Sequence, residues 1–249
     1  MIERSSSNDV VTLRLAHGKV SALDLELAEA LALTFNELAT SDARAVVLTG
    51  TGSSFSAGVD LFRVVDGGSD YVQRFFPALS RLVLDLLGFP KPLIVAANGH
   101  AIAGGCIFTL CGDYRLMAAG TARIGMPELL VGVPFPASVV EVIRFAVPPQ
   151  HLQSLIYTGR TVEPQEALRL GLIDEVTDNL AARAEEVAAH FASLPAEGFG
   201  LAKRQLRGRA INRAKHYAHE LDADALDAWS SETTHARIRE YLSRTVKRK

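Results

Sequence analysis

Two kinds of group in the middle of the chain could act together on a carbonyl compound: backbone amides at a glycine turn, and one isolated carboxyl group. The turn contains Ala103, Gly104 and Gly105, follows the apolar run Leu93–Ala97, and leads directly into an apolar helical segment. The N–H groups in the first turn of a helix have no intrahelical partners, and glycine lets a ligand oxygen approach them closely. We therefore expect this turn to bind an anion or an oxygen atom that becomes negative during a reaction.

The isolated carboxyl group is that of Glu128, in the stretch Met-Pro-Glu-Leu. It is the only acidic residue between Asp113 and Glu141, and apolar residues flank it on both sides. Apolar surroundings disfavour the ionised form and raise the pKa of a carboxyl group, which suits a general base. The alternative is a structural ion pair with Arg123 or Arg144, since such pairs also perturb carboxyl groups.

A second glycine loop carries Ser56, Ala57, Gly58, Val59 and Asp60, and it follows a short β-branched run. Two loops at strand ends, each offering one backbone N–H, could hold a single carbonyl oxygen while negative charge develops on it. Loss of one such donor typically costs about 3 to 4 kcal/mol of transition-state stabilisation. Each glycine taken singly could instead serve only to permit a turn with positive φ.

The elements that must position these groups alternate between strands and helices. Residues 10–15, 45–49 and 93–97 are expected to be strands, and residues 24–38 and 71–87 are expected to be amphipathic helices. This alternation predicts an α/β domain whose ligands bind where strand ends meet loops. After Gly132 the pattern becomes mainly helical.

Helices are expected in six segments of this later part, with a brief strand-like stretch at 172–176: 137–145, 149–157, 164–170, 180–194, 200–207 and 212–228. We accordingly divide the chain into a core, residues 1–194, and a helical C-terminal segment, residues 195–249.

The charge and composition of the chain argue against nucleic acid and membrane as binding partners. The formal net charge of -2 gives no general attraction to nucleic acid, and the chain shows no signal peptide and no apolar run long enough to cross a membrane. Cys106 and Cys111 lie five residues apart in an apolar helix, which suits neither a disulfide nor a metal site, so we expect buried thiols. A cytoplasmic protein without membrane or nucleic-acid partners is expected.

Four motifs in order, FSAGVDL, PLIVAANGHAIAGGC with CGDYRL behind it, IGMPELLVGV and YTGRTVEPQEALRLGLIDEV, resemble the crotonase superfamily, the enoyl-CoA hydratase/isomerase family. The likeness runs from about Val10 to the C-terminus. It implies a spiral core of ββα units with a helical C-terminal trimerisation segment, and a homotrimer or dimer of trimers. It also implies an acyl-CoA thioester substrate, with CoA present only as part of that substrate and no metal or other cofactor.

The resemblance also implies site residues. The N–H groups of Val59 and Gly104 would hold the thioester oxygen as an oxyanion hole, and Glu128 would be the catalytic carboxyl group. Ser56, Ala57 and Asp60 would border the CoA path, although a structural role is expected for the Asp60 carboxylate. Two further substrate contacts are expected at Ile107 and Pro134, the latter in a segment, residues 133–136, that could close the pocket.

One departure from the family pattern bears on the reaction. Hydratases of the family carry a second glutamate directly after Gly-Gly-Cys, where this chain has Ile107. Isoleucine cannot transfer a proton, whereas one glutamate is enough to move a proton from C2 to C4 of a 3-enoyl thioester. The pattern is therefore similar to the enoyl-CoA isomerase subgroup. Dienoyl-CoA isomerases use a further acid eight residues after the first, where this chain has Pro136.

Alternatives remain at this point: a hydratase or related activity that uses Glu128 alone, or an acyl-CoA-binding protein without turnover. Glu141 is expected on a helix surface facing solvent, and His100 in a turn satisfied by the backbone. Trp229 and Tyr241 are expected to be packing anchors. Lys203 and Arg204 are considered as contacts for CoA phosphates.

Overall fold

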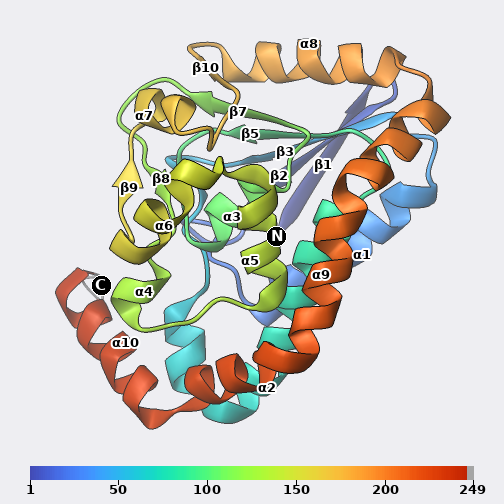
Figure 1. Cartoon of the computed structure of the whole chain (residues 1–249). Coiled ribbons are helices and arrows are strands. Elements are labelled where there is room, and N and C mark those ends of the chain that lie inside the picture. Colours follow the sequence, from blue (N-terminus) through green and yellow to red (C-terminus); the bar gives the residue numbers. More distant parts are fainter. Residues whose placement is uncertain (246–249) are drawn as a thin grey trace.

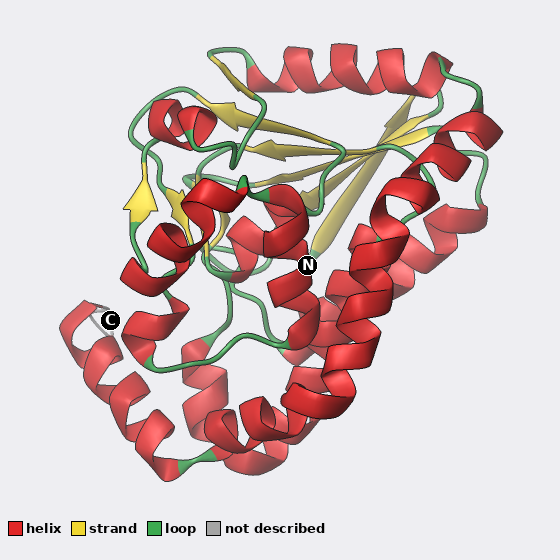
Figure 2. Cartoon of the chain, viewed as in Figure 1, coloured by secondary structure: helices red, strands yellow, loops and turns green. Residues whose placement is uncertain are grey.

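The computed structural model describes residues 1–245, and its chain order repeats a strand, strand, helix unit (Figures 1 and 2). The units are β1 Ile2–Ser7, β2 Val10–Leu15, α1 Leu25–Thr40; β3 Ala45–Gly50, β4 Ser54–Ser56, α2 Leu61–Leu87; β5 Leu93–Ala97, β6 His100–Ile102, α3 Gly104–Leu110; and β7 Tyr114–Ala118, β8 Ile124–Gly125, α4 Glu128–Val131. Each unit after the first sends its first strand to one sheet and its second strand to another.

The remaining elements are mostly helical. They are α5 Ala137–Ala146, α6 Pro149–Thr158, β9 Thr161–Val162, α7 Pro164–Arg169, β10 Glu175–Thr177, α8 Leu180–Ser193, α9 Ala196–Ser230 and α10 Glu232–Thr245. Helix α8 covers one face of the larger sheet, and the long α9 runs down the side of the molecule before α10 turns back towards α4 (Figure 1).

The described strands form two sheets. Within residues 1–245, the larger sheet has the order β1-β2-β3-β5-β7-β10, parallel except for the β1–β2 hairpin, and the smaller has the order β4-β6-β8-β9. Strands β3 and β5 are buried along their whole lengths, which explains their continuous apolar sequences. Parallel β4 and β6 end side by side, and the loop carrying Gly58 and the turn carrying Gly104 directly follow them.

Helix α2 begins ten residues earlier than residue 71, where we expect it. The Asp60 carboxylate caps it by accepting hydrogen bonds from the N–H groups of Phe62 (3.0 Å) and Arg63 (3.1 Å). Gly68 interrupts the helix with φ 62° and ψ −158°, a conformation that only glycine adopts readily. Gly68 therefore marks a kink within the helix, and the helix starts before it.

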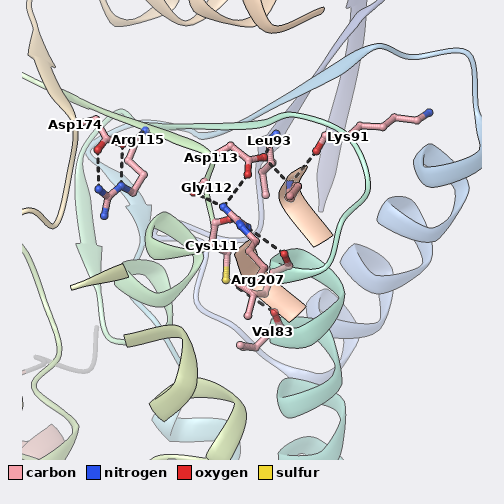
Figure 3. A network of polar contacts seen from close by, with 11 residues as sticks. Val83, Lys91, Leu93, Cys111, Gly112, Asp113, Arg115, Asp174 and Arg207 are labelled. Carbon is pink, nitrogen blue, oxygen red and sulfur yellow. Dashed lines mark hydrogen bonds and ion pairs between the residues drawn. The ribbon is translucent and has the colours of Figure 1, made fainter. Parts of the chain in front are cut away.

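A buried ionic cluster attaches α9 to the core (Figure 3). Asp113 forms ion pairs with Lys203 (2.5 Å) and Arg207 (2.8 Å), and Arg207 also donates to the carbonyl oxygens of Cys111 (2.7 Å) and Gly112 (2.9 Å) at the end of α3. The Lys203 side chain is only 5% exposed, so our idea that it contacts CoA phosphates is wrong. The cluster fixes α9 against the helix whose opposite end carries Gly104.

Two further expectations concern buried groups. Cys106 and Cys111 are buried, free thiols, as expected. Glu141 is not on the surface: it is fully buried, and Arg144 (2.8 Å) and Arg213 (2.7 Å) neutralise it, because α5 packs against α9 along this face. Among residues 1–245, no helix combines the length and the apolar character that a bilayer crossing requires.

Candidate active site

A cavity of about 440 Å³ lies where the loop after β4, the turn before α3 and helix α4 meet. Its lining is apolar apart from a few groups, and it comes from segments between residues 20 and 139 and from the end of the chain. The residues include Val20, Ala22, Ala57, Val59, Asp60, Leu61, Phe62, Leu79, Val83, Ile102, Ala103, Gly104, Ile107, Phe108, Pro127, Glu128, Val131, Val133, Pro134, Phe135, Pro136, Val139, Trp229, Tyr241 and Leu242.

The Val59 amide is left available by the hydrogen bonds on either side of it. Leu23 N–H donates to the Gly58 carbonyl (2.7 Å), and Asp60 N–H donates to the Leu23 carbonyl (2.9 Å), so Leu23 holds the loop as a strand would. In this pattern the N–H of Val59 itself is turned away from Leu23. It donates no hydrogen bond to another residue within the described chain.

The Gly104 amide is left available because it begins a helix. The first bond of α3 runs from Ile107 N–H to the Ala103 carbonyl (3.1 Å), and the Gly104 N–H has no acceptor within residues 1–245. The two loops touch: a Cβ added to Gly58 would lie 2.9 Å from the Gly104 nitrogen, and one added to Gly104 would lie 3.9 Å from the Val59 nitrogen. The two available amides therefore belong to loops that are in direct contact, and Val59 and Gly104 both line the cavity.

Glu128 is the first residue of α4, and its carboxyl group is isolated. Its Oε2 is buried without a hydrogen-bond partner in the described part of the chain. Burial raises the pKa of Glu128 to about 8. Neither candidate arginine reaches it, because Arg123 pairs with Glu163 (3.6 Å) and Arg144 pairs with Glu141. A carboxyl group of this kind can accept and return a proton near neutral pH.

The other expected contacts divide into two groups. Ala57, Asp60, Ile107 and Pro134 line the cavity together with Val59, Gly104 and Glu128. Ser56 does not, and this corrects our expectation: it is buried behind the wall, where its hydroxyl donates to the Ser21 carbonyl (2.8 Å) and accepts from Gly58 N–H (3.2 Å). Ser56 therefore shapes the loop that presents Val59.

Three lining residues from the end of the chain, Trp229, Tyr241 and Leu242, were not expected to line the site. Trp229 is the packing anchor we expected, since its ring meets Phe75 and Phe76 and its Nε1 donates to the Pro134 carbonyl (2.7 Å). The apolar face of the last helices signals burial, but it does not say which neighbour covers that face. His100 is satisfied by a backbone donor as expected, because Arg123 N–H donates to its Nδ1 (3.1 Å).

Ala103 carries backbone strain at the edge of the site. Its φ of 52° and ψ of −121° cost a residue with a Cβ about 1 to 3 kcal/mol. Glycine removes this strain. Because glycine also raises the conformational entropy of the unfolded chain, part of the resulting gain in the free energy of unfolding is lost. We predict that Ala103→Gly raises the free energy of unfolding by about 1 kcal/mol, measured by urea denaturation. A loss of stability of that size would show that packing of the Ala103 methyl group outweighs its strain.

Residues 5–245 match the protein family described as Enoyl-CoA hydratase/isomerase. A putative enoyl-CoA hydratase of Thermus thermophilus is 39% identical over 177 residues, covering 67% of this chain and 69% of the relative. Enoyl-CoA delta isomerase 1 of Rattus norvegicus mitochondria is 28% identical over 212 residues, covering 83% and 73%. The crystal structure of human mitochondrial delta3-delta2-enoyl-CoA isomerase superimposes with a TM-score of 0.93 at 23% identity, covering 98% of this chain and 97% of that chain.

Proposed function

Because the chain belongs to the enoyl-CoA hydratase/isomerase family, we propose that it moves the double bond of a 3-enoyl-CoA thioester to the 2-trans position. The Glu128 carboxylate removes a proton from C2; the C2–H electron pair forms a C1–C2 double bond while the carbonyl π pair moves to the thioester oxygen, which gives a dienolate that keeps the C3–C4 double bond. The N–H groups of Val59 and Gly104 form the oxyanion hole that stabilises the resulting dienolate. Glu128 then returns the proton to C4. Atoms and charge balance without a metal or redox cofactor.

The observation that carries this proposal is that, among the described residues that line the cavity, Glu128 has no second acid free to transfer a proton. Asp60 also lines the cavity, but its carboxylate is occupied as the cap of α2. Ile107, at the position where hydratases carry a glutamate, lines the same cavity and cannot exchange a proton. Proton removal and return at one thioester is a reaction that a single carboxyl group can complete.

A turnover assay tests the proposal. The protein is incubated with 3-hexenoyl-CoA, and formation of the conjugated 2-enoyl thioester is followed by its ultraviolet absorbance. We expect the absorbance to rise with the amount of enzyme. A protein that binds 2-enoyl, 3-enoyl and saturated esters but converts none of them would be an acyl-CoA-binding protein, which would overturn the proposal.

Enoyl-CoA hydration is the second candidate. The name of the Thermus thermophilus relative, a putative enoyl-CoA hydratase, favours it. In that case Glu128 alone would activate water for addition to C3. Incubation with 2-hexenoyl-CoA separates the candidates, since hydration removes the conjugated absorbance whereas the isomerase leaves 2-enoyl-CoA almost unchanged.

The pH dependence should report the ionisation of Glu128. Only the carboxylate can remove a proton, and burial raises the pKa of Glu128 to about 8. We predict that kcat/KM for 3-hexenoyl-CoA rises about tenfold per pH unit up to about pH 8 and is constant above it. Initial rates between pH 6 and pH 9.5 measure this. A profile that is already constant at pH 6 would mean that the base titrates near the ordinary value for glutamate, about 4.3.

A further inference from the structure

A second hollow lies directly behind the wall of the active-site cavity. It is a groove of about 720 Å³ between α1, α2 and α9, with a partly aromatic lining that includes Phe35, Phe76, Phe89, Ser80, Leu84, Asp222 and Leu226. None of the residues lining the groove lines the active-site cavity. The proposed reaction gives the groove no role.

The wall between the two spaces is made by α2 and the end of α9. Along α2, Leu79 and Val83 line the active-site cavity, whereas Ser80 and Leu84 line the groove. Along α9, Leu226 lines the groove and Trp229, one turn later, lines the cavity. Helix α2 and the end of α9 therefore separate the two spaces, each with some side chains facing the cavity and others facing the groove.

Phe76 and Trp229 meet across this wall. Their rings lie edge to face with centroids 5.8 Å apart, Phe76 lining the groove and Trp229 the cavity. Both are almost completely buried, at 2% and 3% exposure. The hydrogen bond from Trp229 Nε1 to the Pro134 carbonyl fixes the indole in place. The barrier is therefore held by a hydrogen bond on the cavity side and by the contact between the two buried rings.

The chemistry of the cavity indicates which part of a substrate reaches this barrier. The available amides of Val59 and Gly104 and the Glu128 carboxyl group define where the thioester lies. Beyond them, the fully buried lining is hydrocarbon, supplied by Val83 and Phe108 among others, and the one polar group of Trp229 is already bonded. The unbranched hydrocarbon chain of an acyl-CoA fits such a lining, because it has no polar group that would be buried without a hydrogen-bond partner.

We propose that the Phe76–Trp229 pair sets the upper limit of acyl-chain length, so that the protein selects unbranched hydrocarbon chains that end at this barrier and excludes longer ones. This inference rests on the proposed function only in taking an acyl-CoA as the ligand. The groove supplies the space that a longer chain would enter if the barrier were thinned.

Binding of saturated acyl-CoA esters tests the limit without depending on turnover. Calorimetric titration of hexanoyl-, octanoyl-, decanoyl-, dodecanoyl- and tetradecanoyl-CoA, each below its micellar concentration, gives Kd as a function of chain length. Each buried methylene raises affinity about fourfold. In the unaltered protein we expect affinity to rise and then to stop rising before tetradecanoyl-CoA. A continuous rise through the series would overturn the proposal.

Two variants thin the barrier, and a third is the control. Phe76→Leu removes one ring, and Trp229→Phe replaces a double ring with a single one, which keeps aromatic packing if the first variant folds poorly. We call the chain length at which affinity stops rising the break. We expect either variant to move this break to longer chains and to raise the affinity for tetradecanoyl-CoA relative to octanoyl-CoA at least about tenfold. Phe35→Leu makes the same change as the first variant on the far side of the groove, against Phe89, and should leave the break in place.

The experiments distinguish failure of the chain-length proposal from failure of the proposed reaction. An unchanged break in both barrier variants, or an equal shift in Phe35→Leu, would overturn the assignment of Phe76 and Trp229. If the protein did not convert 3-enoyl-CoA but bound the saturated esters as expected, the proposed reaction would be overturned. The proposed limit on acyl-chain length would then still hold.

Discussion

Glu128→Gln should lower kcat for conversion of 3-hexenoyl-CoA to 2-hexenoyl-CoA by about three orders of magnitude, with little change in the Kd of hexanoyl-CoA. Glutamine has nearly the shape of glutamate but cannot carry the proton, and a positioned general base typically contributes about 10² to 10⁴ in rate. The loss should exceed the lower end of that range, because one group serves both proton transfers. Stopped assays at high enzyme concentration measure the residual rate. A variant that keeps a tenth of the activity would exclude Glu128 as the base.

The control for this variant is its stability, which should not fall at alkaline pH. Burial raises the pKa of Glu128 from 4.5 to about 8, so the folded state favours the protonated form. The penalty is absent below about pH 4.5, grows as pH rises towards 8, and is complete above that value. Glutamine carries no such penalty, so Glu128→Gln should be more stable than the unaltered protein at pH 9, by up to about 5 kcal/mol, and similar to it at pH 4.5. Urea denaturation at both pH values separates lost chemistry from lost structure.

Strands buried on both faces were the easiest elements to predict. The expected strand at residues 93–97 coincides with β5 at both ends, because it lies between β3 and β7 and must be apolar throughout. Strand β1 was missed, since five of its six residues are exposed at the sheet edge and show no apolar pattern. The spiral of ββα units with a helical C-terminal segment, which the resemblance to the crotonase superfamily implies, is confirmed by the fold and by its structural relatives.

Glycines misled the prediction of helix boundaries. The helices expected at 200–207 and 212–228 form one helix, α9, which passes through Gly208 without a break. A glycine lowers helix propensity by about 1 kcal/mol, which packing of the neighbouring Ala210 and Ala214 against the core can outweigh. Whether a helix continues through a glycine therefore depends on tertiary contacts, which the local sequence pattern does not show.

The site was predictable where its groups come from loops at strand ends. From the residues we expected only that two glycine loops at strand ends could offer amides to one carbonyl oxygen, and the resemblance to the crotonase superfamily pointed to Val59 and Gly104. These residues follow the neighbouring parallel strands β4 and β6, which the sequence analysis did not predict. Ser56 and Glu141 were misplaced for a shared reason: the side of the backbone on which a polar side chain lies depends on partners distant in sequence. Ser56 bonds to Ser21, and Glu141 to Arg213 on α9.

Gly58→Ala should lower kcat for the isomerisation by about 10² to 10³, the loss expected when one donor of an oxyanion hole is displaced. Gly58 has a φ of +80°, and an added Cβ would lie 2.6 Å from the Ile102 carbonyl oxygen and 2.9 Å from the Gly104 nitrogen. Both contacts are with backbone, which cannot turn aside as a flexible side chain can. The two loops must separate, and the amides of Val59 and Gly104 then no longer converge on one oxygen. Steady-state rates with 3-hexenoyl-CoA measure the effect.

Gly208→Ala is the matched control for this loss. It makes the same chemical change in α9, where an added Cβ would meet nothing within 4 Å and φ is not positive. The rate should be unchanged, and the free energy of unfolding should rise by about 0.5 to 1 kcal/mol through helix propensity. Folding of Gly58→Ala is monitored by circular dichroism, because the crowded methyl group also costs about 1 to 3 kcal/mol of stability. If folded Gly58→Ala turned over within threefold of the unaltered rate, stabilisation of the dienolate would have to come from groups other than these two amides.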